Sequence, residues 1–337
     1  MLHRPLYRFL GRFLKRYDRR KIASKIIWQS DFEYAINHAQ LVNSRTLLFS
    51  CDIHPNEPQS SSEHLPYLDT LLTCVEAFLH KDPKGIPSIY IPSDGLAYFS
   101  RQIAPNIHSP FVMITGDSDL AINHANLGAA LDDLLQSPQL LAWHAQNRDH
   151  DHPKLHSFPI GINVHNLWSN PLQWGGGFIL PSMQELQVQT IAQAAPLLKE
   201  RRPSIFCNWH FSIDRADRKD CYRLIDHSLC EFQSSPLPMA DTWQLQSQHQ
   251  FVLSPHGAGF DCHRTWEALL LGCIPIVKKA RINDLFIDLP VIEVQDWSEI
   301  NRSNLDTWLR EVRQKPFNRE KLTNQYWTAK IAASKNQ

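Results

Sequence analysis

The chain has 337 residues, of which 43% are hydrophobic and 20% charged, a composition typical of globular proteins rather than disordered or fibrous ones. Its 34 Lys and Arg balance 34 Asp and Glu, which argues against a general nucleic-acid-binding protein, because such proteins carry a surplus of positive charge. The length favours two domains. The mean hydropathy is −0.34, and no apolar stretch comes near the length of about 20 residues that crossing a bilayer requires, so no membrane-spanning helix is predicted.

The cysteine pattern predicts reduced thiols in a cytoplasmic protein. The seven cysteines are an odd number, and none forms a CxxC pair. They are Cys51, Cys74, Cys207, Cys221, Cys230, Cys262 and Cys273. The first residues show no secretory signal, because no long apolar segment precedes a small-residue cleavage site.

Residues 1–28 are predicted to form a basic amphipathic arm. Residues 1–25 carry nine Arg or Lys and one acid, Asp18, and their apolar residues recur at the spacing of a helical face. Two interpretations stay open. The arm makes a peripheral contact with an anionic membrane at the inner face, or it packs its apolar stripe on the folded domains. In either case it is an appendage to the site.

Residues 29–180 are predicted to form an N-terminal Rossmann-like domain. Strands are expected at 45–50, 88–91 and 111–115, with a short apolar segment at 140–144, and helices are expected at 68–80 and 127–135. Alternating strands and helices favour an open parallel sheet, whose chemistry lies at the carboxyl ends of its strands. Asp52 follows the first predicted strand, and Asp117 and Asp119 follow the third.

Residues 181–302 are predicted to form a second Rossmann-like domain that faces the first across a cleft. The expected strands are 204–208, 250–254, 273–277 and 291–294, and the expected helices are 184–200, 218–227 and 261–271. Residues 303–337 are expected to form closing helices, for which packing back on the N-terminal domain is one open arrangement.

The most informative stretch is 251–277, which reads FVLSPHGAGFDCHRTWEALLLGCIPIV. A buried strand leads into Gly257-Ala258-Gly259, where glycines let the backbone pass close to a ligand, and a helix then begins near Asp261, which is expected to be its N-cap. Such a turn presents free amides and a positive dipole end to an anion. Arg264 can clamp a diphosphate, and Glu267 can accept hydrogen bonds from a ribose. The alternative is ordinary turn chemistry with Arg264 and Glu267 as a surface pair.

This stretch resembles the C-terminal signature of the exostosin-like glycosyltransferases, SPxGxGxDxHRxWEALxxGxIPIV. The matching residues are Ser254, Pro255, Gly257, Gly259, Asp261, His263, Arg264, Trp266, Glu267, Ala268, Leu269, Gly272, Ile274, Pro275, Ile276 and Val277. A weaker similarity to bacterial and viral members extends the match over roughly 110–280. Two departures are His256, where many relatives carry Arg, and Gly116-Asp117, where relatives often show His-Asn.

The resemblance implies a GT-B fold that needs no metal and no cofactor, with a nucleotide-sugar donor in the second domain and a glycan or lipid-linked acceptor in the first. The donor-binding candidates are His256, Gly257, Ala258, Gly259, His263, Arg264, Glu267, Asn208 and Arg215. An inverting transferase also needs a base for the acceptor hydroxyl. Asp119 and Asp52 are the candidates, and capping a turn is the alternative role for each.

Other functions are weighed and placed lower. Asp117-Ser118-Asp119 is a DxD sequence that would bind a divalent cation in a metal-dependent transferase, and this remains an alternative. The histidines at 150, 152 and 156 lack a zinc-ligand spacing and are interpreted as a polar loop. The sequence therefore predicts a cytoplasmic glycosyltransferase in surface polysaccharide or glycan synthesis, and a non-catalytic nucleotide- or glycan-binding relative is the competing class.

Overall fold

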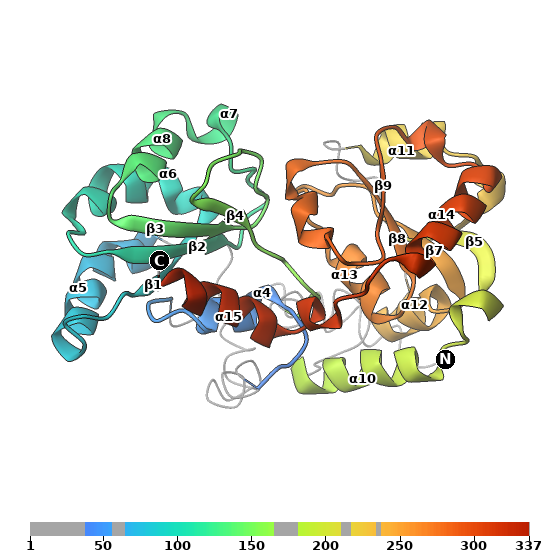
Figure 1. Cartoon of the computed structure of the whole chain (residues 1–337), viewed down its shortest axis with the longest axis horizontal. Helices are drawn as coiled ribbons and strands as arrows, with labels where there is room; N and C mark the ends of the chain where they lie inside the picture. Colours follow the sequence, from blue (N-terminus) through green and yellow to red (C-terminus); the bar gives the residue numbers. More distant parts are fainter. Residues whose placement is uncertain (1–37, 56–64, 165–180, 210–216, 234–236, 337) are drawn as a thin grey trace, which may run out of the picture.

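A computed structural model describes residues 38–55, 65–164, 181–209, 217–233 and 237–336. The basic arm over 1–28 and the donor candidate Arg215 lie outside the described residues. The described chain folds into two α/β lobes that lie side by side, each built on its own parallel sheet (Figure 1). The seven cysteines all lie in described segments and are free thiols.

The first lobe contains a four-stranded parallel sheet in the order β1-β2-β3-β4. Its strands are β1 (Ser88–Pro92), β2 (Phe111–Gly116), β3 (Leu140–Ala145) and β4 (Leu155–Ser157). Every residue of β1 and β2 is buried, as expected when a parallel sheet is covered on both faces. The predicted strands 88–91 and 111–115 are confirmed, and β4 was not predicted because three residues carry too little pattern.

Helices cover both faces of this sheet. They are α4 (Ser44–Phe49), α5 (Leu65–Lys81), α6 (Leu96–Tyr98), α7 (His124–Leu127) and α8 (Ala129–Gln136), with short turns of other helix types at η2 (Ser93–Gly95), η3 (Phe99–Ile103) and η4 (Ala104–Asn106). The strand predicted at 45–50 is wrong, since α4 occupies it. Asn43 caps this helix by accepting a hydrogen bond from the amide of Thr46 at 2.8 Å. A short apolar run does not distinguish a buried strand from a buried helix.

The second lobe contains a five-stranded parallel sheet in the order β6-β5-β7-β8-β9. Its strands are β5 (Arg202–Cys207), β6 (Cys230–Phe232), β7 (His249–Leu253), β8 (Ile274–Lys278) and β9 (Ile292–Val294). The chain first adds β6 on one side of β5 and then adds β7 on the other. The connections therefore reverse direction between β5 and β7, which is where open α/β sheets usually bind ligands.

The helices of the second lobe follow the predicted alternation. They are α10 (Pro181–Ala194), α11 (Arg218–Leu224), α12 (Met239–Gln246), α13 (His263–Leu270) and α14 (Arg302–Gln314), with 3-10 turns at η5 (Leu198–Glu200), η6 (His227–Leu229), η7 (Arg281–Phe286) and η8 (Trp297–Glu299). Leu305 and Val312 of α14 pack into the core of this lobe. The boundary expected at 303 is therefore too early, because α14 belongs to the second lobe.

The chain then returns to the first lobe through η9 (Arg319–Leu322) and α15 (Asn324–Ser334), and α15 lies beside α4 (Figure 1). The amide of Val42 donates to the carbonyl of Leu322 at 2.9 Å, and the side chain of Asn324 donates to the carbonyls of Ala39 and Leu41. Of the predicted closing helices, α15 thus packs back on the first lobe. The two lobes also share one apolar cluster, in which Trp266 and Trp327 meet edge to face.

The packing of α15 on β3 buries a histidine, and this predicts acid sensitivity. Burial, followed by repulsion from His156 and Lys330, lowers the pKa of His144 to about 3. A lowered pKa means that the folded state prefers the neutral imidazole of His144. The stability that this contributes is complete above pH 6.5 and is lost as the pH falls toward 3. Each unit of difference in pKa between the folded and unfolded states corresponds to about 1.4 kcal/mol. Urea unfolding at several pH values should show a shallower acid loss for His144→Gln than for the wild type.

The matched control is His80→Gln, which changes an exposed histidine on α5 and should reproduce the wild-type slope. Comparing variants is essential because Asp261 acts with the opposite sign. Burial raises the pKa of Asp261 to about 7, so its contribution to stability is present below about pH 4 and lost as the pH rises through 7. An identical acid slope in wild type and His144→Gln would contradict the burial argument.

Candidate functional site

The glycine loop 255–260 lies at the reversal of the second sheet. It follows β7, while Asn208 and Trp209 follow β5, so both segments leave the carboxyl edge on either side of the reversal point. β-sheet connectivity alone would put a ligand here. The sequence signature and the topology therefore indicate the same place from independent observations.

Arg264 joins these two strand ends. Its Nε donates to the carbonyl of Asn208 at 2.9 Å, and its Nη1 lies 3.3 Å from the carbonyl of Pro255 and 3.4 Å from the hydroxyl of Ser254. The guanidinium carbon also lies 5.9 Å from the ring centre of Trp209. Arg264 thus holds the main chain around the reversal point, a structural duty that the sequence alone did not predict.

Some backbone amides of the loop donate hydrogen bonds within the protein, and others do not. The amide of Gly257 donates to the carbonyl of Gly259 at 3.0 Å, and the amide of Asp261 donates to Asn147 Oδ1 at 3.1 Å. Within the part of the chain that the structure describes, the amides of Ala258 and Gly259 donate no hydrogen bond. They are the loop donors left for an anion.

Residues of the first lobe hold the loop in place. Asn147 adopts a left-handed conformation with φ of 54°, and its side chain also donates to the carbonyl of Ser118. The amide of Ile160 donates to Asp261 Oδ2 at 2.7 Å. The N-cap of α13 is therefore Cys262 and not Asp261, which the sequence predicted. The buried carboxylate of Asp261 instead accepts hydrogen bonds, one of them from the indole N–H of Trp266.

Gly259 is needed because Asn147 leaves no room for a side chain there. A Cβ at Gly259 would lie 2.7 Å from both terminal atoms of Asn147. We expect Gly259→Ala to destabilise the fold by about 1–3 kcal/mol through overpacking and to weaken ligand binding by displacing the loop. Denaturant unfolding and calorimetric binding would measure both effects.

The rescue variant is Gly259→Ala combined with Asn147→Gly, since glycine removes the clash and accepts the positive φ of position 147. The two substitutions should couple, so that the double variant is more stable than the sum of the single effects predicts. Simple additivity would show that Asn147 does not set the size limit at Gly259.

A cavity of about 770 Å³ opens in front of the loop and is lined by both lobes. Its charges are polarised in their balance. The first lobe contributes two carboxylates, Asp119 and Asp149, whereas the second contributes three cations beside the glycine loop, Lys278, Lys279 and Arg281, together with one carboxylate, Asp217. The volume lies within the roughly 300–1,000 Å³ usual for small-molecule sites. An anionic group is therefore favoured on the second-lobe wall and hydroxyl groups on the first-lobe wall.

The two carboxylates of the DxD sequence have different environments. Asp119 lines the cavity. Asp117 has a φ of 60° and forms a buried ion pair with Arg45, with 2.5 Å between the Oδ2 and Nη1 atoms. Both partners are nearly inaccessible, at 5% exposure for Arg45 and 6% for Asp117. The structure thus assigns Asp117 to the fold and leaves Asp119 at the cavity.

Asp52 does not reach this cavity, and its selection as a base followed from the strand wrongly predicted at 45–50. Its carboxylate accepts hydrogen bonds from the amide and hydroxyl of Ser88 at 2.7 and 2.6 Å and pairs with Lys335. Ser88 begins β1, so Asp52 lies at the amino edge of the sheet, opposite the carboxyl edge that carries Asp119. These contacts tie the segment around Asp52 to the start of β1 and to the end of α15, which is a structural role.

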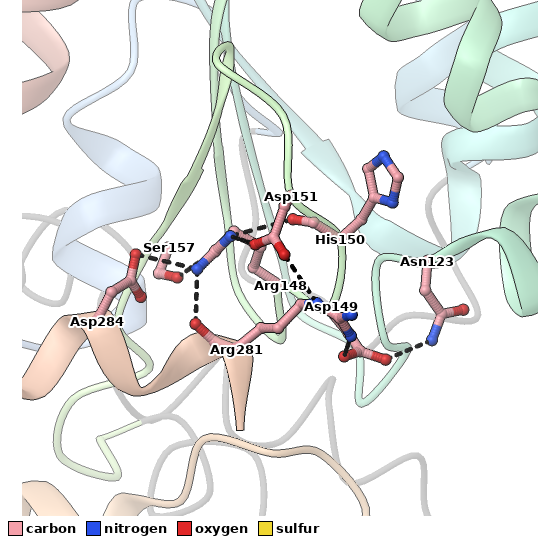
Figure 2. Close-up of polar contacts among 8 residues, drawn as sticks. All are labelled: Asn123, Arg148, Asp149, His150, Asp151, Ser157, Arg281 and Asp284. Atoms are coloured by element: carbon pink, nitrogen blue, oxygen red, sulfur yellow. Dashed lines mark hydrogen bonds and ion pairs between the residues drawn. The ribbon is translucent and has the colours of Figure 1, made fainter. Parts of the chain in front are cut away.

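Figure 2 shows an ion-pair network, two members of which, Asp149 and Arg281, line the cavity. Arg281 of the second lobe donates to Asp149 and Asp151 at 3.1 and 3.0 Å, and Arg148 of the first lobe reaches Asp284 at 3.2 Å and the carbonyl of Arg281 at 2.6 Å. The guanidinium of Arg148 is mostly buried, so its pairing is less screened by solvent than that of exposed Arg281. The network links the two lobes beside the cavity.

The other predicted donor residues lie around the loop with different duties. His256 lines the cavity, with its Nδ1 3.8 Å from Asp217 Oδ2, and burial lowers its pKa. His263 Nδ1 is 2.7 Å from the carbonyl of Gly161, and burial lowers the pKa of His263 to about 4. Burial raises the pKa of Glu267, which does not line this cavity.

Sequence reasoning missed several residues of the site. Lys278 ends β8 at the carboxyl edge, and Lys279 and Arg281 follow it; the basic string VKKAR is the sequence signal for them. Arg218 begins α11, and its Nε reaches the carbonyl of His256 at 3.3 Å from a mostly buried position. Asn147 could not be identified, because only the lobe contact reveals it.

Comparisons with known proteins leave the chain without an assigned family: no family model matches it, and no curated protein does. Among the described helices, none is both long and apolar enough to cross a membrane. The described residues also contain no group of three or more histidine, cysteine or acidic side chains arranged to hold a metal ion.

Proposed function

We propose that the protein is a glycosyltransferase with a GT-B arrangement, which transfers a sugar from a nucleoside diphosphate donor to a glycan or lipid-linked acceptor. The observation that carries this proposal is the polarised cavity at the reversal point of the second sheet. A cationic wall with free loop amides suits a diphosphate, and a carboxylate on the opposite wall suits an acceptor hydroxyl.

In this proposal the second lobe stabilises the leaving group. Ala258, Gly259, Lys278 and Lys279 line the cavity, and their amides and ammonium groups would bind the diphosphate there. Charge that develops on the bridging oxygen as the glycosidic bond breaks is then met by donors already oriented. His256 lies on the same wall, but its lowered pKa makes it a neutral hydrogen-bonding group near pH 7 rather than a cation.

The first lobe supplies the base. Asp119 lines the cavity from the first lobe, and its carboxylate would accept the proton of the acceptor hydroxyl as the oxygen attacks the anomeric carbon. Asp149 lines the same wall but already accepts from Arg281 and from Asn123 at 2.9 Å. Asp119, which follows β2 at the carboxyl edge of the first sheet, is the candidate that the sequence singled out.

The deciding experiment is a panel of nucleotide sugars tested with the purified full chain. Calorimetric binding and release of free nucleotide would be measured in parallel, with and without EDTA. Binding with turnover in EDTA supports a metal-independent transferase. Loss of turnover in EDTA favours the DxD alternative, and binding without turnover favours the non-catalytic alternative. Liposome binding with and without residues 1–25 tests the proposed membrane contact.

A further inference from the structure

A second cavity, of about 320 Å³, lies where α15, the end of the first sheet and η7 meet. His144 of β3 and His156 of β4 line it, with ring centres 5.4 Å apart. Lys321 of η9, and Lys330 and Tyr326 of α15, line it from the returning segment. Asp284 of η7 contributes the acidic group on its wall.

The charge balance of this cavity is positive. Asp284 is already paired with Arg148 at 3.2 Å, so its charge is largely neutralised. Lys321 donates to the carbonyls of Leu285 and Ile287, and Asp288, which does not line the cavity, also acts on its charge. Lys330 lies 5.5 Å from the ring centre of Tyr326. The lining thus presents two lysines and one carboxylate, and Arg148 already pairs with that carboxylate.

The histidines respond to this imbalance. Burial is the largest cause that lowers the pKa of both histidines. The charge of Lys330 lowers both pKa values further, His156 lowers that of His144, and Arg148 lowers that of His156. The acidic neighbour Asp284 acts in the opposite direction on His156. An anion in the cavity would offset the repulsion and give both rings a partner for their protonated form.

A metal ion fits these residues less well than an anion. His144 Nε2 is 3.0 Å from the hydroxyl of Ser334, which occupies one of its two ring nitrogens. In the described residues the cavity lacks a third ligand suitably placed beside the two histidines. The lysines would also repel a cation from the same volume.

We propose that this cavity is a second ligand site, separate from the proposed donor cavity, which binds a small oxyanion such as a phosphate group between α15 and the histidine pair. The site is independent of the proposed glycosyl transfer, because none of its residues lines the larger cavity. Its volume is at the lower end of the usual range for ligand sites, which suits a phosphate ion or a small phosphorylated molecule.

The test uses the full chain, inorganic phosphate as the probe and the melting temperature as the readout. Phosphate should raise the melting temperature at pH 7, because a ligand that binds the folded state stabilises it. Lys330→Gln, a change on the exposed side of α15, should reduce this increase. Lys199→Gln removes the same charge from an exposed position in η5 and should leave it unchanged.

Histidine NMR separates this site from the donor cavity. Phosphate should move the titration midpoints of His144 and His156 to higher pH, and Lys279→Gln in the larger cavity should not alter that change. A sugar 1-phosphate that acts at lower concentration than phosphate would identify a phosphorylated metabolite as the source, whereas equal potency would identify the free ion. Unmoved histidine resonances, or a full thermal response in Lys330→Gln, would overturn the proposal.

Discussion

Replacing Asp119 with Asn is expected to lower the turnover number of sugar transfer by about 10²–10⁴-fold, the usual contribution of a positioned general base. Asn keeps the shape of the side chain on the first-lobe wall but does not accept the proton. The donor wall is built from the glycine loop and from Lys278 and Lys279, so donor affinity should stay within a few-fold of the wild type. Steady-state kinetics and calorimetry on the same preparation would give both numbers.

The control for this experiment is Asp133→Asn, which makes the same change on the exposed face of α8 and should leave transfer unchanged. Asp149→Asn is informative in a different way, because it also breaks the contacts to Arg281 and Asn123. If Asp149→Asn abolished turnover while Asp119→Asn left it intact, the base assignment would pass to Asp149. Donor binding lost together with turnover in Asp119→Asn would show a binding role instead.

Replacing Arg45 with Met is expected to destabilise the protein by about 3–5 kcal/mol, because it leaves the buried carboxylate of Asp117 without a partner. Met preserves most of the side-chain volume, so the loss reports on charge rather than on a cavity. Chemical denaturation at pH 7 would measure it. This is the largest stability change that we expect from a single substitution outside the apolar core.

The second half of the cycle uses Asp117→Asn and the double variant. Asn tolerates the left-handed backbone of position 117, and combining it with Arg45→Met removes both charges, so the double variant should recover much of the lost stability. Asp117→Asn also tests the metal alternative. Transfer that stays at the wild-type level, unaffected by added divalent cation, would support a structural role, and loss of transfer that Mn²⁺ partly restores would support a metal ligand.

The sequence resemblance and the structure support the proposed function to different extents. The string from Phe251 to Val277 predicted a strand, a glycine turn, a helix and a second strand, and all of these are present. Those elements follow from local signals: a buried apolar run, two glycines and a helical periodicity. What the string did not reveal is that Arg264 is bound to the carbonyls of Asn208 and Pro255.

The wrong predictions have a common physical origin. The strand expected at 45–50 is helix α4 because Asn43 caps it and because α15 packs against it from the far end of the chain. Because 45–50 is not a strand, Asp52 does not lie at the carboxyl edge of the sheet, where we expected it, but at its amino edge. A short apolar segment takes its conformation from its tertiary partners, and those partners are not visible in a local window.

The sequence alone determined the α/β class, the two series of strands, and the place of the glycine loop after a buried strand, since each depends on residues close together in the chain. Only the tertiary structure decided which charges meet. It paired Asp117 with Arg45, brought Asp119 to the same cavity as Lys278 and Lys279, and joined the lobes through Arg148 and Arg281. The reason is that such contacts join residues tens to hundreds of positions apart, and Coulomb interactions depend on distance in space and on burial rather than on separation along the chain.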